Sequence, residues 1–292
     1  MAGGKTKGHL AALFTVVIWG TTFISTKVLL RSFTTIEILF LRFVMGYIAL
    51  WILKPEVLKL REMKEELLFL FAGLSGVFLY YFLENTAVSY TLASNVGVIT
   101  STAALFSAII ARFTLKEEAD ALERTFVIGF LIAMAGIALI SFNGSELHLN
   151  PVGDLLALSS AFTWGIYSVL SKKISDLGYP TVQATRRIFM YGLVFMLPMV
   201  FLSGIDVEPS ALSNPVNFLN LLFLGFLASA ACFVTWNYAV RELGAVMTSV
   251  YIYAIPVVTV VFSTLILSEP ITLLSGSGTI LILIGLVISE RK

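Results

Sequence analysis

Ten apolar stretches of about 20 residues each run through the 292-residue chain, with little polar sequence between them. A bilayer core about 30 Å thick is crossed by about 20 helical residues, so each stretch is long enough to span a membrane. The predicted spans, numbered 1 to 10, cover residues 8–30, 34–53, 66–89, 92–115, 124–142, 152–173, 181–202, 216–240, 243–267 and 271–289. These stretches predict an all-α integral membrane protein that works within the bilayer.

Composition supports this class and excludes several others. Apolar residues make up 58% of the chain and charged residues 13%, whereas soluble proteins carry about 25% charged residues. The apolar runs are too long for β-strands and lack an alternation of period two. A net charge of +1 provides no basic field for nucleic acid. Cys232 is the only cysteine, which excludes an internal disulfide and a cysteine-based metal cluster.

No enzyme signature is present in the sequence. His9 and His148 lie in a terminus and in a connection, outside any spacing typical of metal ligands. No phosphate-binding loop accompanies the spans, so the chain by itself does not bind and hydrolyse ATP. We therefore expect no enzymatic activity and no cofactor.

The basic residues predict the orientation of the chain in the membrane. Fourteen of the 19 Lys and Arg residues lie at the termini and in the even-numbered connections, whereas the odd-numbered connections carry only Arg31. Cytoplasmic connections are enriched in Lys and Arg. Both termini are therefore predicted to be cytoplasmic, in a multi-pass protein of the cell membrane. The connection at 143–150 has no Lys or Arg and is predicted to be external.

The chain repeats itself at nearly constant shifts. Spans 1 and 2 match spans 6 and 7 at a shift of 145 residues, spans 3 and 4 match spans 8 and 9 at 152, and span 5 matches span 10 at 149. The matched pairs are Gly8 with Gly153, Trp19-Gly20 with Trp164-Gly165, Lys27 with Lys172, Arg42 with Arg187, Gly73 with Gly225, Asn85 with Asn237, Glu117 with Glu269, and Gly129 and Gly136 with Gly278 and Gly285. A series in register indicates an internal duplication.

An odd number of spans per copy makes the second copy inverted relative to the first. We predict two inverted five-helix repeats, one at residues 1–145 and one at 151–292. Inverted repeats are typical of secondary transporters, in which two related halves open a central site to each side of the membrane in turn.

The repeated segments resemble a known family. Trp19-Gly20, the segment ENTAVSYTLASNVGVITSTAALFSAIIARFTLKEE (84–118) and its counterpart NYAVRELGAVMTSVYIYAIPVVTVVFSTLILSEP (237–270) are similar to the drug/metabolite transporter superfamily, and the layout resembles its EamA-like ten-helix exporters. The resemblance implies a central cavity lined by spans 1, 3, 4, 6, 8 and 9, with spans 5 and 10 as packing elements. It also implies export.

Polar and aromatic residues at helical spacing are the candidates for that cavity. Such residues line substrate sites, but each one is also a common helix–helix hydrogen bond worth about 0.6 kcal/mol. The candidates are Thr15, Trp19, Thr22, Tyr81, Glu84, Asn85, Ser94, Thr100, Ser101, Thr163, Trp164, Tyr167, Trp236, Asn237, Thr248 and Tyr251. The repeated pair Asn85 and Asn237 fits structural contacts equally well.

Charged residues inside the spans have two interpretations each. Glu84 is either a proton or cation site, and so the candidate coupling residue, or a structural acid. Arg42, Arg186 and Arg187 either bind an anion or have a structural role, in which they reach the headgroups or form an ion pair, and the structural role is favoured.

Glycine and proline positions suggest where helices pack and bend. Gly97 and Pro256 are candidate hinges, although a static kink fits Pro256 equally well. Gly129 and Gly136, with Gly278 and Gly285, predict close helix packing, either inside one chain or between protomers. We expect a monomer or a weak homodimer.

Together these features predict a secondary transporter of small metabolites that works by alternating access, most simply an exporter of amino acids or related amphipathic solutes. Coupling is either to protons or to the solute gradient alone. A non-transporting membrane receptor or assembly partner, and a passive channel, are the alternatives.

Overall fold

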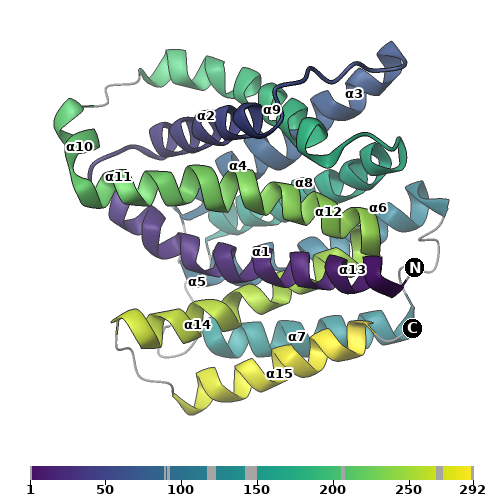
Figure 1. The fold of residues 1–292 in the computed structure, drawn as a ribbon. Coiled ribbons are helices and arrows are strands. Elements are labelled where there is room, and N and C mark those ends of the chain that lie inside the picture. The colour runs from purple at the N-terminus through teal and green to yellow at the C-terminus, as the bar shows by residue number, and fades with distance from the viewer. Residues whose placement is uncertain are drawn as a thin grey trace.

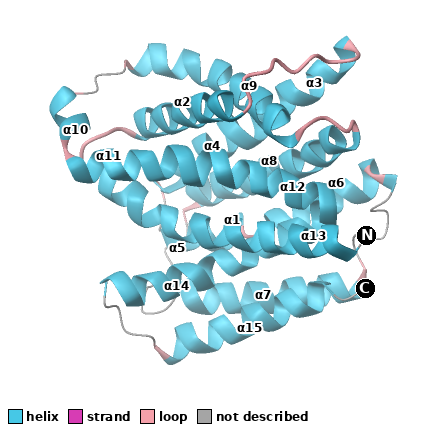
Figure 2. Cartoon of the chain, in the orientation of Figure 1, coloured by secondary structure: helices cyan, strands magenta, loops and turns pink. Residues whose placement is uncertain are grey.

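The computed structural model describes residues 2–88, 90, 93–116, 123–141, 150–204, 208–267 and 272–290. Within these residues the chain forms helices and no strand (Figures 1 and 2). The helices run side by side along one direction. The helix α1 (Ala2–Leu29) begins and α15 (Leu273–Glu290) ends at the same end of the bundle, on the right of Figure 1. We call this the terminal end, and the opposite end, which holds residues 30–34, the distal end.

All ten predicted spans correspond to helices. Some are built from consecutive elements that continue one another. In the first half, span 1 is α1, and spans 2 to 5 are α2 (Thr35–Leu53), α3 (Met63–Ala72) with η1 (Gly73–Leu79) and α4 (Tyr80–Val88), α5 (Ala93–Thr100) with α6 (Ala103–Thr114), and α7 (Arg124–Ser141). In the second half, spans 6 to 10 are α8 (Pro151–Asp176), α9 (Thr181–Ser203), α11 (Pro215–Leu222) with η3 (Phe223–Ala231) and α12 (Cys232–Leu243), α13 (Ala245–Val250) with η4 (Tyr251–Tyr253) and α14 (Ala254–Leu267), and α15. A short helix, α10 (Pro209–Ser213), lies between spans 7 and 8.

Local sequence explains several helix boundaries. Thr34 and Glu37 form a reciprocal capping box at the start of α2. At the start of α8, the Asn150 side chain accepts hydrogen bonds from the backbone N–H groups of Val152 and Gly153, and Pro151 occupies the first turn. Gly204 and Gly244 end α9 and α12 with φ angles of 69° and 91°, which favour glycine.

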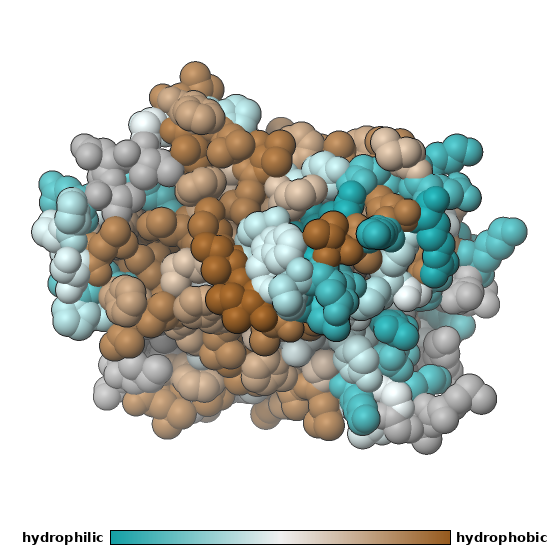
Figure 3. Space-filling view, turned by 45° about the horizontal axis from the view of Figure 1, so that its top comes forward, coloured by the Kyte–Doolittle hydropathy of each residue, from teal (hydrophilic) through white to brown (hydrophobic). Residues whose placement is uncertain are grey.

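The surface of the bundle is that of a membrane protein. Five helical segments of the described chain, at 35–53, 63–87, 96–114, 181–203 and 215–243, are long and apolar enough to cross a bilayer. At 28 and 26 residues, α1 and α8 also have the length. Hydrophobic side chains cover the middle of the face in Figure 3, and hydrophilic ones gather mainly toward its right-hand end, with a smaller group at the left.

The two halves pack around an approximate two-fold relation. Span 1 packs on span 8 and on span 9, and its counterpart span 6 packs on span 3 and on span 4. Span 2 packs on spans 7 and 8, and its counterpart span 7 packs on spans 2 and 3. The order in which the spans pack therefore repeats when the halves are exchanged.

The pair α7 and α15 shows directly that the halves are inverted. Gly129 lies against Gly285 and Ser289, whereas Gly136 lies against Gly278 and Ile282, so these equivalent helices run antiparallel. A Cβ at Gly136 would lie 2.5 Å from the Gly278 carbonyl oxygen, which shows how closely the two backbones approach. The glycine faces are thus used within one chain.

Equivalent spans also share their irregular segments. Spans 3 and 8 both contain a π-helical segment, η1 and η3, which the sequence did not predict. The α-helix of span 4 is interrupted at residues 101–102, and that of span 9 tightens to a 3₁₀ turn at Tyr251–Tyr253. The shift of 152 relates residues 101–102 to residues 253–254, so the two irregular segments lie at nearly equivalent positions. Pro256 lacks an N–H for the carbonyl of Ile252, which explains the 3₁₀ turn before it. Gly97 lies one turn before the break in span 4.

Candidate functional site

An aromatic cluster occupies the centre of the bundle. The rings come from four spans: Trp19 from α1, Tyr80 from α4, Trp164 from α8, and Phe233 and Trp236 from α12. The Trp164 ring centroid lies 5.3 Å from Trp19, 4.7 Å from Tyr80 and 5.8 Å from Trp236. Trp19, Trp164 and Trp236 are all buried. These three predicted lining residues therefore meet at the centre, where they contact one another.

The three indoles of this cluster differ in their hydrogen bonds. The Trp19 Nε1–H donates to the Ala228 carbonyl oxygen at 3.0 Å and so joins α1 to η3. The Nε1 atoms of Trp164 and Trp236 are buried and have no hydrogen-bond partner among the described residues. A buried donor without a partner is costly, because it has lost its bond to water. The centre of the bundle thus holds two indole donors that a bound group could satisfy.

Arg42 lies beside this cluster and does not extend to the headgroups. The residue is 5% exposed. Its Nε–H donates to Ser229 Oγ at 2.9 Å, and its guanidinium lies 5.0 Å from the ring centroid of Tyr81. Ser229 is midway along the 215–243 span. The side chain is therefore held inside the bundle, and among the described residues no carboxylate lies in ion-pair contact with it. The two interpretations of Arg42 stay predictions.

Glu84 lies near the same pair of tyrosines, Tyr80 and Tyr81. Its carboxylate accepts a hydrogen bond of 2.9 Å from the Tyr80 hydroxyl, and the Tyr80 and Tyr81 rings pack edge to face at 4.9 Å. Glu84 is partly exposed, and no basic side chain forms an ion pair with it in the described part of the chain. In the described chain Glu84 thus has no base within ion-pair distance, although the charge of Arg42 lies close enough to act on it.

Arg187, the counterpart of Arg42, has a carboxylate partner. It forms an ion pair with Glu66, and its Nη1 donates to the Leu58 carbonyl oxygen at 3.0 Å. The neighbouring Arg186 donates to the carbonyl oxygens of Lys54 and Glu56. These contacts fit the structural interpretation of both arginines, and they hold the 54–62 connection against α9 at the terminal end.

The connection between α8 and α9 also takes part in this closure. The Tyr179 hydroxyl donates to Glu65 Oε2 at 2.5 Å and accepts from the Arg61 N–H at 2.9 Å. Burial and the hydrogen bond to Glu65 raise the pKa of Tyr179. The terminal end is thus covered by a connection bonded at several points.

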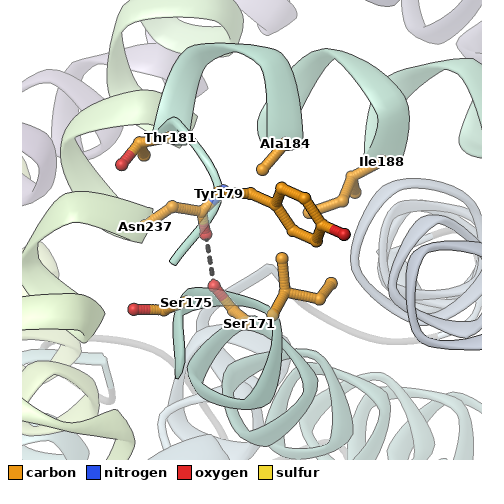
Figure 4. A pocket seen from close by; sticks show the side chains of 8 residues that line it. Ser171, Ser175, Tyr179, Thr181, Ala184, Ile188 and Asn237 are labelled. Carbon is orange, nitrogen blue, oxygen red and sulfur yellow. Dashed lines mark hydrogen bonds between the residues drawn. The ribbon is translucent and has the colours of Figure 1, made fainter. Parts of the chain in front are cut away.

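Asn237 joins three spans close to the terminal end. Its Oδ1 accepts from the Tyr167 hydroxyl at 2.7 Å and from Ser171 Oγ at 2.6 Å, both on α8. Its Nδ2 donates to Thr185 Oγ1 on α9 at 2.9 Å. All four residues are buried. We call these three bonds the Asn237 contact, and Figure 4 shows the bond to Ser171 beside a cavity of about 20 Å³.

The equivalent place in the first half is open. Asn85 makes no hydrogen bond through its side chain to any described residue. It lines a cavity of about 330 Å³ at the distal end, together with Thr34, Ile36 and Leu39. The counterparts of these four residues line the cavity of about 20 Å³, and they are Asn237, Tyr179, Thr181 and Ala184. The regions around Asn85 and Asn237 are therefore related by the repeat, but the first encloses a much larger cavity than the second.

Most hydroxyl candidates bond within the packed helices. Thr15 bonds to Thr235 across α1 and α12 at 2.7 Å. Tyr251 bonds to His9 Nδ1 at 2.7 Å. The remaining hydroxyls donate to carbonyl oxygens of their own helix: Thr22 to Trp19, Thr100 to Val96, Ser101 to Gly97, Thr163 to Ser160 and Thr248 to Gly244. The side chain of Ser94 and the residues 142–149 lie outside the described part of the chain.

Sequence reasoning missed a buried serine contact. Ser249 on α13 donates to Ser107 on α6 at 3.0 Å and lies 3.4 Å, Oγ to Oγ, from Ser168 on α8. Lone serines in apolar helices carry no distinctive pattern. The internal repeat gave no signal either, because the shift of 152 pairs Ser249 with Gly97.

No group of His, Cys, Asp and Glu that could hold a metal ion occurs among the described residues. The arrangement instead offers charged and aromatic groups at the centre of a membrane bundle, with one end closed and the equivalent place at the other end open. Such an arrangement can bind a small solute and release it to one side.

Comparisons with known proteins agree with this architecture. The model of the EamA-like transporter family matches residues 6–142 and again residues 151–290. The chain is 28% identical over 293 residues to an uncharacterized transporter of Archaeoglobus fulgidus, covering 99% of both chains. It is 24% identical over 295 residues to a probable amino-acid metabolite efflux pump of Escherichia coli, covering 97% of this chain and 94% of the relative.

A solved crystal structure has the same fold. It superposes with a TM-score of 0.82 at 19% identity and covers 97% of each chain. The relatives are named transporters or efflux pumps, which are not enzymes, as the sequence predicts. With a family model that covers both halves, the chain belongs to the EamA-like transporter family and is a multi-pass membrane transporter.

Proposed function

We propose that the protein is a secondary transporter that exports amino acids or related amphipathic solutes by alternating access. The observation that carries this proposal is the difference between two equivalent places in the halves. The Asn237 contact closes one around a cavity of about 20 Å³, while Asn85 lines a cavity of about 330 Å³ at the other. The first volume holds about one water molecule.

In a protein with inverted repeats, a difference in cavity size between equivalent regions indicates two alternating conformations. If each half can adopt the conformation of the other, the closed end opens when the open end closes. In the exchanged state, Asn85 would take the role of Asn237. The counterparts of Tyr167 and Ser171 are Thr22 and Thr26, both hydroxyl residues that can bond to an asparagine.

The direction and the solute class rest on separate support. The excess of Lys and Arg favours a cytoplasmic terminal end, so the described conformation would face outward. The aromatic centre suits a solute with an apolar body, and one relative is named for the efflux of amino-acid metabolites. Proton coupling through Glu84 and exchange driven by the solute gradient alone are the two coupling schemes.

The test is counterflow of radiolabelled L-phenylalanine and L-leucine into proteoliposomes loaded with the unlabelled solute. A carrier shows saturable counterflow. Flux without saturation would indicate a channel, and absence of flux for every amino acid tested would contradict amino-acid transport. Trp164→Ala should abolish counterflow in protein that still folds, because it removes the ring that contacts Trp19, Tyr80 and Trp236. Trp51→Ala is the control for the removal of a tryptophan as such. The Trp51 ring lies under Arg186 near the end of α2, outside the aromatic cluster.

A further inference from the structure

We propose that Arg42 and Glu84 recognise the two opposite charges of a zwitterionic solute, with Arg42 taking its carboxylate and Glu84 its ammonium group. This inference rests on the proposed transport function and names the chemistry of its binding site. It is carried by the absence of an ion-pair partner for either residue in the described chain, by their positions about the Tyr80–Tyr81 pair, and by the indole donors beside them.

The internal repeat provides a control for Arg42 within the same molecule. Arg187, at the equivalent position, is neutralised by Glu66. The shift of 152 pairs Glu66 with Phe218, an apolar residue whose side chain is exposed. In the described part of the chain, the first-half arginine therefore lacks the carboxylate that the second-half arginine has. A carboxylate from a solute would fill the same chemical role.

A buried arginine needs such a partner more than an exposed one does. Arg42 donates to Ser229 and faces the Tyr81 ring, which satisfies its Nε–H and part of its charge. A guanidinium carries five N–H donors in a planar fork that matches a carboxylate. Its bonds to Ser229 and Tyr81 both go to neutral groups, so no carboxylate occupies the fork among the described residues. At mid-span, no headgroup can provide the missing anion.

Glu84 provides the opposite charge at the right side of the cluster. Its carboxylate accepts one bond, from Tyr80, and so can accept further bonds from an ammonium group. Tyr80, which bonds to Glu84, packs edge to face on Tyr81, which lies beside Arg42, so the two charges are near each other without forming an ion pair. A solute with both charges can bridge them.

The surrounding groups favour an amino acid with an apolar side chain. The unpartnered Nε1–H donors of Trp164 and Trp236 can bond to carboxylate oxygens, and their rings can pack on an aromatic or aliphatic side chain. Two residues that line the distal cavity lie near Arg42 and Glu84 on the same helices. Leu39, which lines that cavity, lies three residues before Arg42 on the same face of α2, and Asn85 follows Glu84 directly.

The experiment compares three probes that differ only in their charged groups: L-phenylalanine, phenethylamine, which lacks the carboxylate, and 3-phenylpropionate, which lacks the amine. Binding is followed by the intrinsic tryptophan fluorescence of the full chain in nanodiscs. We expect L-phenylalanine to bind most tightly. Arg42→Gln should weaken L-phenylalanine and 3-phenylpropionate by about 10- to 100-fold and leave phenethylamine unchanged. Glu84→Gln should weaken L-phenylalanine and phenethylamine and leave 3-phenylpropionate unchanged.

Controls and contrary outcomes follow from the same design. Arg241→Gln and Glu208→Gln, both at exposed positions, should not change the affinity for any probe. Equal weakening of all three probes by Arg42→Gln would indicate a structural role and overturn the proposal, as would absence of L-phenylalanine binding to the unaltered protein at millimolar concentration. Selective binding without counterflow would instead contradict the transport function and leave the site intact. Counterflow that is indifferent to Arg42→Gln would contradict the site and leave the function intact.

Discussion

Removing the Asn237 side chain should open the terminal end of the protein. The Asn237 contact consists of three side-chain hydrogen bonds of 2.6 to 2.9 Å between spans 6, 7 and 8. Such bonds inside membranes contribute about 0.6 kcal/mol each on average, so Asn237→Ala should cost the closed conformation about 2 kcal/mol, or about 30-fold in the ratio of closed to open protein. Tyr167→Phe removes one bond and should shift the ratio by about threefold.

Cysteine labelling measures this ratio. Ser175 lines the small cavity and its hydroxyl is buried, so Ser175→Cys in a Cys232→Ala background should react slowly with a water-soluble maleimide while the end is closed. In nanodiscs, where both ends are accessible, Asn237→Ala should raise the labelling rate in proportion to the open fraction. Asn220→Ala is the matched control, since the Asn220 amide bonds only within its own helix at 2.8 Å. An unchanged labelling rate in folded Asn237→Ala protein would refute the proposed closure.

Three further predictions address packing, pH and charge. Gly136→Leu should lower the stability in detergent by about 3 kcal/mol or more, because a Cβ there would lie 2.5 Å from the Gly278 carbonyl oxygen. Gly97→Ala should not lower the stability, because the space around position 97 is open. Equal thermal stability of the two variants would contradict the packing argument. In the unaltered protein the rate of counterflow should fall at low pH, because the Glu84 carboxylate is neutralised and can no longer pair with an ammonium group. Glu84→Gln should flatten this pH dependence. Identical pH profiles of the two proteins would make Glu84 a structural residue. Arg187→Gln should lower stability by about 1–2 kcal/mol because it leaves the partly buried Glu66 without its partner, and the further change Glu66→Gln should restore part of the loss in thermal unfolding.

Much of the architecture follows from the sequence for a simple physical reason. Backbone groups in lipid must bond within their own segment, so a long apolar stretch such as 35–53 can only be a helix. The shifts between the halves predicted which helices are equivalent, and the contact of Gly129 with Gly285 shows that they are inverted. The division of the chain at 1–145 and 151–292, and the cytoplasmic location of the termini, stay predictions.

Only some residues of the candidate site could be predicted from the sequence. Trp19, Trp164 and Trp236 could be selected because large aromatic side chains with a polar N–H stand out inside a span, and two of the three are related by the repeat. Hydroxyl residues such as Thr15 and Thr248 could not be separated from packing contacts, because a threonine bonds equally well to a neighbouring helix or to a carbonyl of its own.

The sequence by itself determined the helical class, the repeat and the residues that carry charge inside the bilayer, because these depend on local composition and spacing. Only the tertiary structure decided which of those charges have partners. Arg42 and Arg187 occupy equivalent positions, yet Arg187 meets Glu66 whereas Arg42 meets Ser229 and Tyr81. The difference arises from the packing of helices that are far apart in the chain, and no local pattern records it.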